Sequence, residues 1–67
     1  MLHGPKIHAS IAERRDGYMV TVSITEDNQT HELVTKTVPS RSEAETIAKA
    51  FASLHGVPWY KLEVSSS

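Results

Sequence analysis

The side chains best suited to chemistry in this chain of 67 residues are its four histidines, because cysteine is absent. They are His3, His8, His31 and His55. No two of them have the i, i+4 spacing with which a helix presents zinc ligands, and a closed zinc site without cysteine would also require carboxylates. We therefore expect scattered surface histidines, and we predict neither a metal site nor a cofactor.

Catalytic carboxylates and nucleophiles are also poorly placed. Metal-dependent nuclease chemistry needs several carboxylates around a divalent ion, yet the first predicted strand carries only Glu13, at its far end. Asp16 and Asp27 fall in predicted turns. Serine is present without the G-x-S-x-G elbow of hydrolases, and the three glycines are too scattered for a phosphate-binding loop. We therefore predict that the protein is not an enzyme.

Size and charge narrow the remaining classes. A chain of 67 residues forms one domain at most, and we assign residues 1–5 to an N-terminal extension, 6–64 to the domain and 65–67 to a disordered tail. Seven basic and eight acidic side chains give a net charge of −1, which provides no general attraction to nucleic acid or anionic lipid. No apolar stretch approaches the ~20 residues that span a bilayer, so we expect a cytoplasmic protein without a membrane partner.

Two strands and a tight turn are predicted first. Apolar residues alternate with polar ones over 6–13 and again over 18–25, as in half-buried strands. Asp16-Gly17 between them is a favoured type I′ pair, because both central residues of that turn need positive φ. With this pair as the turn, Ile11 faces Val22, and the apolar sets of both strands share one face.

A third strand is predicted over 30–38, with two alternatives for its register. A two-residue Asp27-Asn28 turn places Leu33, Thr35 and Thr37 on the core side, whereas a three-residue loop places Val34, Lys36 and Val38 there. Mixed polarity on both sides is typical of an edge strand.

A helix and a last strand complete the chain. Ser40 and Glu43 form a capping box, and the apolar residues Ala44, Ile47, Ala48, Phe51 and Leu54 follow at helical spacing. Gly56 ends the helix as its C′ residue, and alternation over 57–64 predicts a strand. The resulting fold is a single α+β domain, β-β-β-α-β: an antiparallel meander with one helix on one face and strand four parallel to strand one, in the order 3-2-1-4.

The uncovered face of this sheet and its two edge strands are the surfaces left for a partner. The candidate binding residues are His8, Arg14, Arg15, Met19, Thr21, Lys36, Trp59 and Lys61. Arg14 and Arg15 belong to the first hairpin tip and the others to the uncovered face, Lys36 by the first of its two registers. An exposed tryptophan beside basic side chains suits base stacking or a protein hot spot. The alternative is that Trp59 folds over the helix end and the rim of the core.

Short motifs in the chain resemble two families. The run Asp16-Gly17-Tyr18-Met19-Val20-Thr21-Val22, with Lys36-Thr37-Val38 and Ser42-Glu43-Ala44-Glu45, resembles the arm-type DNA-binding domain of phage integrases, which is similar to plant AP2 domains. This resemblance implies a three-stranded sheet that lies in the major groove of DNA. Asp16-Gly17-Tyr18 and Glu43-Ala44 also resemble the partial RNase-H-like antitoxin fold of HicB type, which implies a non-catalytic protein that binds a partner toxin.

These observations together predict a small non-catalytic bacterial or phage module. We expect it to act through its uncovered face and edge strands on a protein partner, or on a second copy of itself as a homodimer. The nearly neutral net charge favours protein over nucleic acid. The alternative is a nucleic-acid-binding domain whose three-stranded sheet contacts DNA or RNA.

Overall fold

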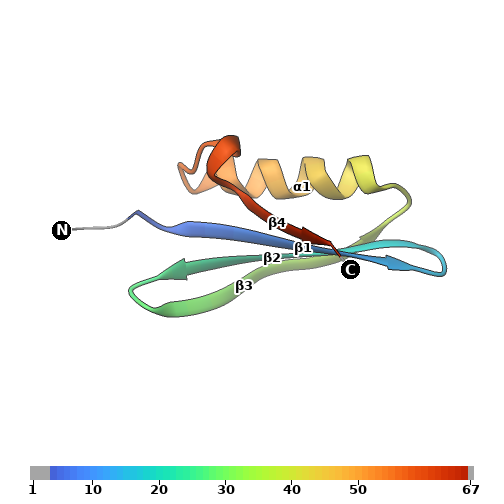
Figure 1. The fold of residues 1–67 in the computed structure, drawn as a ribbon, viewed down its shortest axis with the longest axis horizontal. Coiled ribbons are helices and arrows are strands. Elements are labelled where there is room, and N and C mark those ends of the chain that lie inside the picture. Colours follow the sequence, from blue (N-terminus) through green and yellow to red (C-terminus); the bar gives the residue numbers. More distant parts are fainter. Residues whose placement is uncertain (1–3, 67) are drawn as a thin grey trace.

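The computed structural model describes residues 4–66, which form a four-stranded sheet with one α-helix against it (Figure 1). The strands are β1 (Lys6–Arg14), β2 (Gly17–Glu26), β3 (Gln29–Val38) and β4 (Glu63–Ser66), and the helices are α1 (Arg41–Leu54) and a short 3-10 helix, η1 (Trp59–Lys61). The predicted element order, the sheet order 3-2-1-4 and the parallel pairing of β4 with β1 are confirmed. The predictions for His3, for residues 1–3 of the extension and for Ser67 lie outside the described residues.

The β1–β2 hairpin has a different turn from the one predicted. The turn is Arg15-Asp16, with Gly17 already paired in β2, so Ile11 faces Val20 and not Val22. The predicted register is therefore wrong by two residues. A displacement of two preserves the alternation of side chains between the faces, and the apolar residues of both strands still lie together against α1.

Glycine is required at position 17 for a reason other than a type I′ turn. Gly17 has a φ of +148°, which side chains disfavour, and a Cβ at this position would overlap the carbonyl oxygen of Val38 and lie 3.2 Å from its carbonyl carbon. Gly17 therefore lets the start of β2 approach the end of β3 closely.

The β2–β3 hairpin combines the two predicted registers. Asp27 and Asn28, with φ of 53° and 65°, form a two-residue turn with positive φ at both positions, as in type I′. A bulge then leaves Leu33 without a direct partner on β2. Beyond the bulge, Val34, Lys36 and Val38 lie on the core side, as the other register predicts.

The helix α1 begins and ends at the predicted caps. The hydroxyl of Ser40 accepts a hydrogen bond from the Glu43 amide at 3.2 Å, as expected of an N-cap. At the other end Gly56 has a φ of +72°, and the amide of Val57 donates to the Ala52 carbonyl at 2.8 Å. This is the bond of a Schellman motif, and Val57 is itself buried.

A row of alanines brings α1 close to the sheet. Ala44, Ala48 and Ala52 are fully buried, and opposite them the largest fully buried side chains are Ile7, Ile11, Val20 and Val22. Ile47 and Phe51 pack against this core from the flank of the helix and are half-buried. Leu54 was wrongly predicted to join them: it is 76% exposed, because it lies off the alanine row, in the last turn.

The C-terminal segment differs most from the sequence prediction. Alternation over 57–64 predicted a strand, but the amide of Lys61 donates to the Pro58 carbonyl at 2.9 Å and closes η1 instead. The strand β4 begins only after η1, and it includes Ser65 and Ser66, which were predicted to be disordered. The boundary drawn at residue 64 is therefore wrong for these two serines.

Candidate interaction surface

The face of the sheet opposite α1 is rich in hydroxyl groups, and no described element covers it (Figure 1). We call it the open face. Its residues follow from strand register: Lys6, His8, Ser10 and Ala12; Met19, Thr21, Ser23 and Thr25; Thr30, Glu32, Thr35 and Thr37; Glu63 and Ser65. Of these, Ala12 and Met19 are apolar, so the open face offers a partner little apolar area.

Several hydroxyl groups of the open face already bond to a neighbouring side chain. The pairs are Thr21–Thr35 at 3.3 Å, Thr25–Thr30 at 2.8 Å and His8–Ser65 at 3.0 Å, the last between the ring Nε2 and the hydroxyl. A partner that binds here must replace these bonds with equivalent ones, or leave polar groups unsatisfied.

Five of the predicted binding residues lie where the sequence placed them. His8, Met19 and Thr21 are on the open face, with His8 exposed and the other two half-buried. Arg14 ends β1 and Arg15 lies in the adjoining turn, so the basic pair does form the tip of the first hairpin.

The other three predicted residues are not on the open face. The β3 bulge puts Lys36 on the helix side of the sheet, where it lines a shallow hollow with Glu43 and Ile47. Trp59 and Lys61 lie in η1, outside the sheet. The placement of these three side chains was therefore wrong, because one bulge and one helical turn interrupt the alternation on which it depended.

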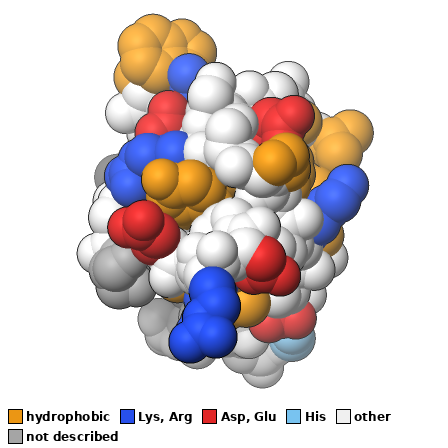
Figure 2. Space-filling model, turned by 90° about the vertical axis from the view of Figure 1, so that its right-hand side faces the viewer, with side chains coloured by type: hydrophobic (Ala, Val, Ile, Leu, Met, Phe, Trp, Pro, Cys, Tyr) orange, Lys and Arg blue, Asp and Glu red, His pale blue; other side chains and the backbone are white. Residues whose placement is uncertain are grey.

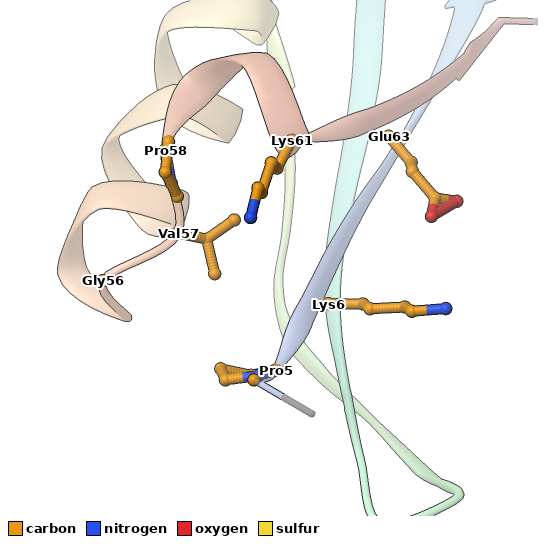
Figure 3. A pocket seen from close by; sticks show the side chains of 8 residues that line it. Pro5, Lys6, Gly56, Val57, Pro58, Lys61 and Glu63 are labelled. Carbon is orange, nitrogen blue, oxygen red and sulfur yellow. The ribbon is translucent and has the colours of Figure 1, made fainter. Parts of the chain in front are cut away.

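Lys61 instead lines a hollow between the start of β1 and the segment after α1 (Figure 3). This hollow has a volume of about 420 Å³, and Lys6, Val57 and Glu63 also line it. Figure 3 shows the Lys61 side chain directed toward Val57, whereas the Lys6 side chain extends away. The two cations do not converge, so the hollow is not arranged to hold an anion.

The large exposed apolar side chains are concentrated late in the chain. Trp59 and Tyr60 are each 68% exposed and Val64 is 46% exposed. The two aromatic rings pack edge to face, with centroids 5.9 Å apart and an interplanar angle of 80°. We call Trp59, Tyr60 and Val64 the C-terminal patch. The alternative placement of Trp59 is therefore only partly met: Trp59 lies beside Lys49 and Ser53 near the end of α1, but it is exposed and does not pack against the core.

A groove separates the C-terminal patch from α1. One hollow of about 380 Å³ is lined by Arg41, Glu45 and Lys49 of α1 and by Trp59, Leu62, Val64 and Ser66. A second, of about 490 Å³, shares Lys49 and Trp59 with the first and continues to Ser53, Val57 and Pro58. We call the two together the α1–β4 groove, because the first hollow lies between the helix and this edge strand.

The charges along this groove are only partly compensated. Arg41 Nε lies 3.3 Å from Glu45 Oε2, and the Arg41 guanidinium also donates to the hydroxyl of Ser66, which ties the end of β4 to the start of α1. Lys49 has no acidic side chain within 4.0 Å in the part of the chain that the structure describes. Its ammonium therefore leaves an uncompensated positive charge in the groove that it shares with Trp59.

The histidines and carboxylates do not gather. His8 and His31 lie on strands that are not neighbours, and His55 is the C-cap of α1. Within residues 4–66, no three His, Asp or Glu side chains are grouped closely enough to hold a metal ion.

The surface charge is mixed. Figure 2, which views the end of the molecule on the right of Figure 1, shows acidic and basic side chains interspersed with apolar ones. Neither of the helices within residues 4–66 has the length and hydropathy of a membrane-spanning segment.

Sequence reasoning missed the helix side of this groove. Arg41, Glu45, Lys49 and Ser53 recur every four residues and form one stripe along α1. That spacing was visible in the sequence. The sequence did not show that η1 and β4 lie beside this stripe of α1, because the 3-10 helix was not predicted.

Comparison of the chain with protein-family models, with curated proteins and with solved structures found no match.

Proposed function

We propose that the protein is a small non-catalytic module that binds a protein partner through the C-terminal patch and the edge of β4. The exposure of Trp59 and Tyr60, 68% each, supports this proposal. Tryptophan and tyrosine dominate the energetics of protein interfaces because they bury a large apolar area and retain a polar group. A partner that covers the two rings gains the free energy of removing that area from water.

The open face is a weaker candidate for the same contact. Its hydroxyl groups bond to neighbouring side chains, as in the pair Thr21–Thr35, and apolar area there comes from Ala12 and Met19. Among residues 4–66, the rings of Trp59 and Tyr60 make no side-chain hydrogen bond, so a partner that covers them displaces water without breaking one there. The balance of desolvation therefore favours the patch.

Nucleic-acid binding is the competing function, and the hairpin tip favours it. Arg14 and Arg15 are exposed there, and Lys6 lies on the open face beside hydroxyl groups that are able to donate to phosphate oxygens. Glu32 and Glu63 share that face, and they repel a polyanion. We therefore rank this function second.

Site-specific photo-crosslinking tests the proposal. A photoreactive side chain is placed at Tyr60 and, as the matched control, at the exposed Thr37 of the open face, and each protein is incubated with extract of its natural host. We expect a discrete protein adduct from position 60 that Trp59→Ala abolishes, with no adduct from position 37. Equal adducts at both positions, or an adduct that survives Trp59→Ala, would contradict the proposal. A duplex mobility shift at low salt that disappears on adding salt would favour nucleic acid instead.

A further inference from the structure

We infer that the α1–β4 groove accepts an extended, acidic segment of the partner, which adds to the free edge of β4 as a fifth strand. This inference rests on the proposed protein-binding function and specifies the chemistry of the partner. It follows from three features of the groove within residues 4–66: β4 is an edge strand, the hollows are long enough for a short peptide, and Lys49 has no acidic partner.

The two edges of the sheet differ in how readily they accept another strand. Edge strands are commonly protected by bulges and by lysine side chains, and β3 has both, in the bulge at Leu33 and in Lys36. The strand β4 pairs with β1 on one side through residues Glu63–Ser66, and it has no bulge in that register. Its outer edge therefore presents regularly spaced amide and carbonyl groups, which is the requirement for strand addition.

The length of the groove matches a short extended peptide. Its helix side runs from Arg41 to Ser53, which at 1.5 Å per residue spans about 18 Å. An extended chain covers that distance in about five residues at roughly 3.3 Å per residue. The segment would pair with the four residues of β4 over the first hollow and continue beside η1 over the second, with alternate side chains directed into the groove.

The side chains of the groove specify an acidic residue beside an apolar one. Trp59 and Val64 offer apolar contacts, and Lys49 shares both hollows with Trp59. Glu45 is already paired with Arg41, so Lys49 remains to attract a carboxylate. Because alternate residues of a strand share a face, the two recognised side chains are expected at positions i and i+2 of the partner segment.

Selection from a random peptide library of about nine residues, displayed on phage, tests this inference with the intact protein as bait. We expect enrichment of sequences with Asp or Glu two residues from an apolar side chain. The selected peptide, labelled with fluorescein, should bind at least about tenfold more weakly to Trp59→Ala and about two- to fivefold more weakly to Lys49→Ala. Lys36→Ala, which removes a lysine from the opposite edge, is the matched control and should leave binding unchanged.

Backbone chemistry distinguishes strand addition from any other contact at the patch. The same peptide with N-methyl groups at alternate amides loses the hydrogen bonds to β4 and should bind at least about tenfold more weakly when the methylated face is the one toward β4. If the N-methylated peptide binds as well as the original, strand addition is wrong. If a peptide with Lys in place of each acidic residue binds as well, the acidic preference is wrong. In both cases the protein-binding function stands. If selection enriches no peptide, or chemical shifts change on β3 and not on β4, the inference is also wrong. A doubled solution mass that Trp59→Ala returns to the monomer would assign the groove to a second copy instead.

Discussion

Replacement of Gly17 by alanine should destabilise the domain more than replacement of either other glycine. Gly17 starts β2 with a φ of +148°, and an added Cβ would overlap the carbonyl oxygen of Val38. The obstacle is backbone and not the end of a flexible side chain, so it cannot move without displacing the end of β3. Gly17→Ala therefore combines an unfavourable backbone conformation with the loss of a close strand contact.

The expected cost is large relative to the stability of so small a domain. A residue held in a disfavoured backbone region costs about 1–3 kcal/mol, and relieving the overlap with Val38 adds to this, for a total of about 2–4 kcal/mol. At roughly 0.05–0.15 kcal/mol per residue, a chain of 67 residues has a free energy of unfolding of about 3–10 kcal/mol. Gly17→Ala should therefore remove a large part of it.

Urea unfolding followed by tryptophan fluorescence and circular dichroism measures this cost. With a slope near 1 kcal/mol per molar urea, the midpoint of Gly17→Ala should fall by about 2 M or more. The other glycines are graded controls. Gly56 has a φ of +72° but nothing within 4 Å of an added Cβ, so Gly56→Ala should cost about 1 kcal/mol. Gly4 has neither constraint, and Gly4→Ala should leave the midpoint nearly unchanged.

The comparison separates the two causes. If Gly17→Ala unfolds at the same urea concentration as Gly56→Ala, backbone conformation alone accounts for the loss and the contact with Val38 is not limiting. If it unfolds with Gly4→Ala, the reasoning about the close approach of β2 and β3 is refuted.

Three further predictions concern the elements that hold the groove in place. Ser40→Ala removes the hydroxyl that caps α1 and should lower the free energy of unfolding by about 1 kcal/mol, as measured in urea. Ser42→Ala, within the first turn, should be neutral or slightly stabilising, because alanine has the higher helix propensity; equal losses would contradict the capping role. Ala48→Leu overpacks the contact between α1 and the sheet and should lower the free energy of unfolding by about 1–3 kcal/mol or more. Ala50→Leu, on the exposed side of α1, is the control and should be nearly neutral. A neutral Ala48→Leu would show that the helix does not approach the sheet closely. Amides of Glu63–Ser66 should exchange with solvent through local opening, well before those in the centre of the sheet, because all four side chains are exposed; protection equal to that of β1 would contradict this.

The sequence predicts the architecture because alternation and capping are local signals that agree with the tertiary structure. The apolar residues of β1 and β2 share a face whichever two-residue turn joins them, so an error of two in register leaves the core intact. Ser40 and Gly56 act within one turn of the helix ends. Such features are decided by residues only a few positions apart, and they are recognisable from the sequence.

The predictions that were wrong concern the first turn, the register of β3 and the C-terminal segment, and these features depend on contacts between residues far apart in the sequence. The motif Asp16-Gly17 suggested a type I′ turn, but Gly17 serves a close approach to Val38, twenty-one positions away in the sequence. The bulge at Leu33 places both Leu33 and Val34 against the core, which strict alternation cannot do. Most of the error in the candidate site comes from this bulge and from η1, because each reverses or ends the alternation that assigned side chains to faces.

The exposure of Trp59 follows from the same alanine row that makes the core compact. Ala44 and Ala48 are fully buried and let α1 approach the sheet closely, and the largest fully buried side chains opposite them are isoleucines and valines. After Gly56 the chain buries Val57, and η1 then places Trp59 beside the stripe of α1 that contains Lys49. A helix with larger residues on its buried side would stand farther from the sheet and leave space for an indole ring. The closely packed core thus leaves the largest side chain of the protein on its surface, beside Lys49 and the edge strand β4.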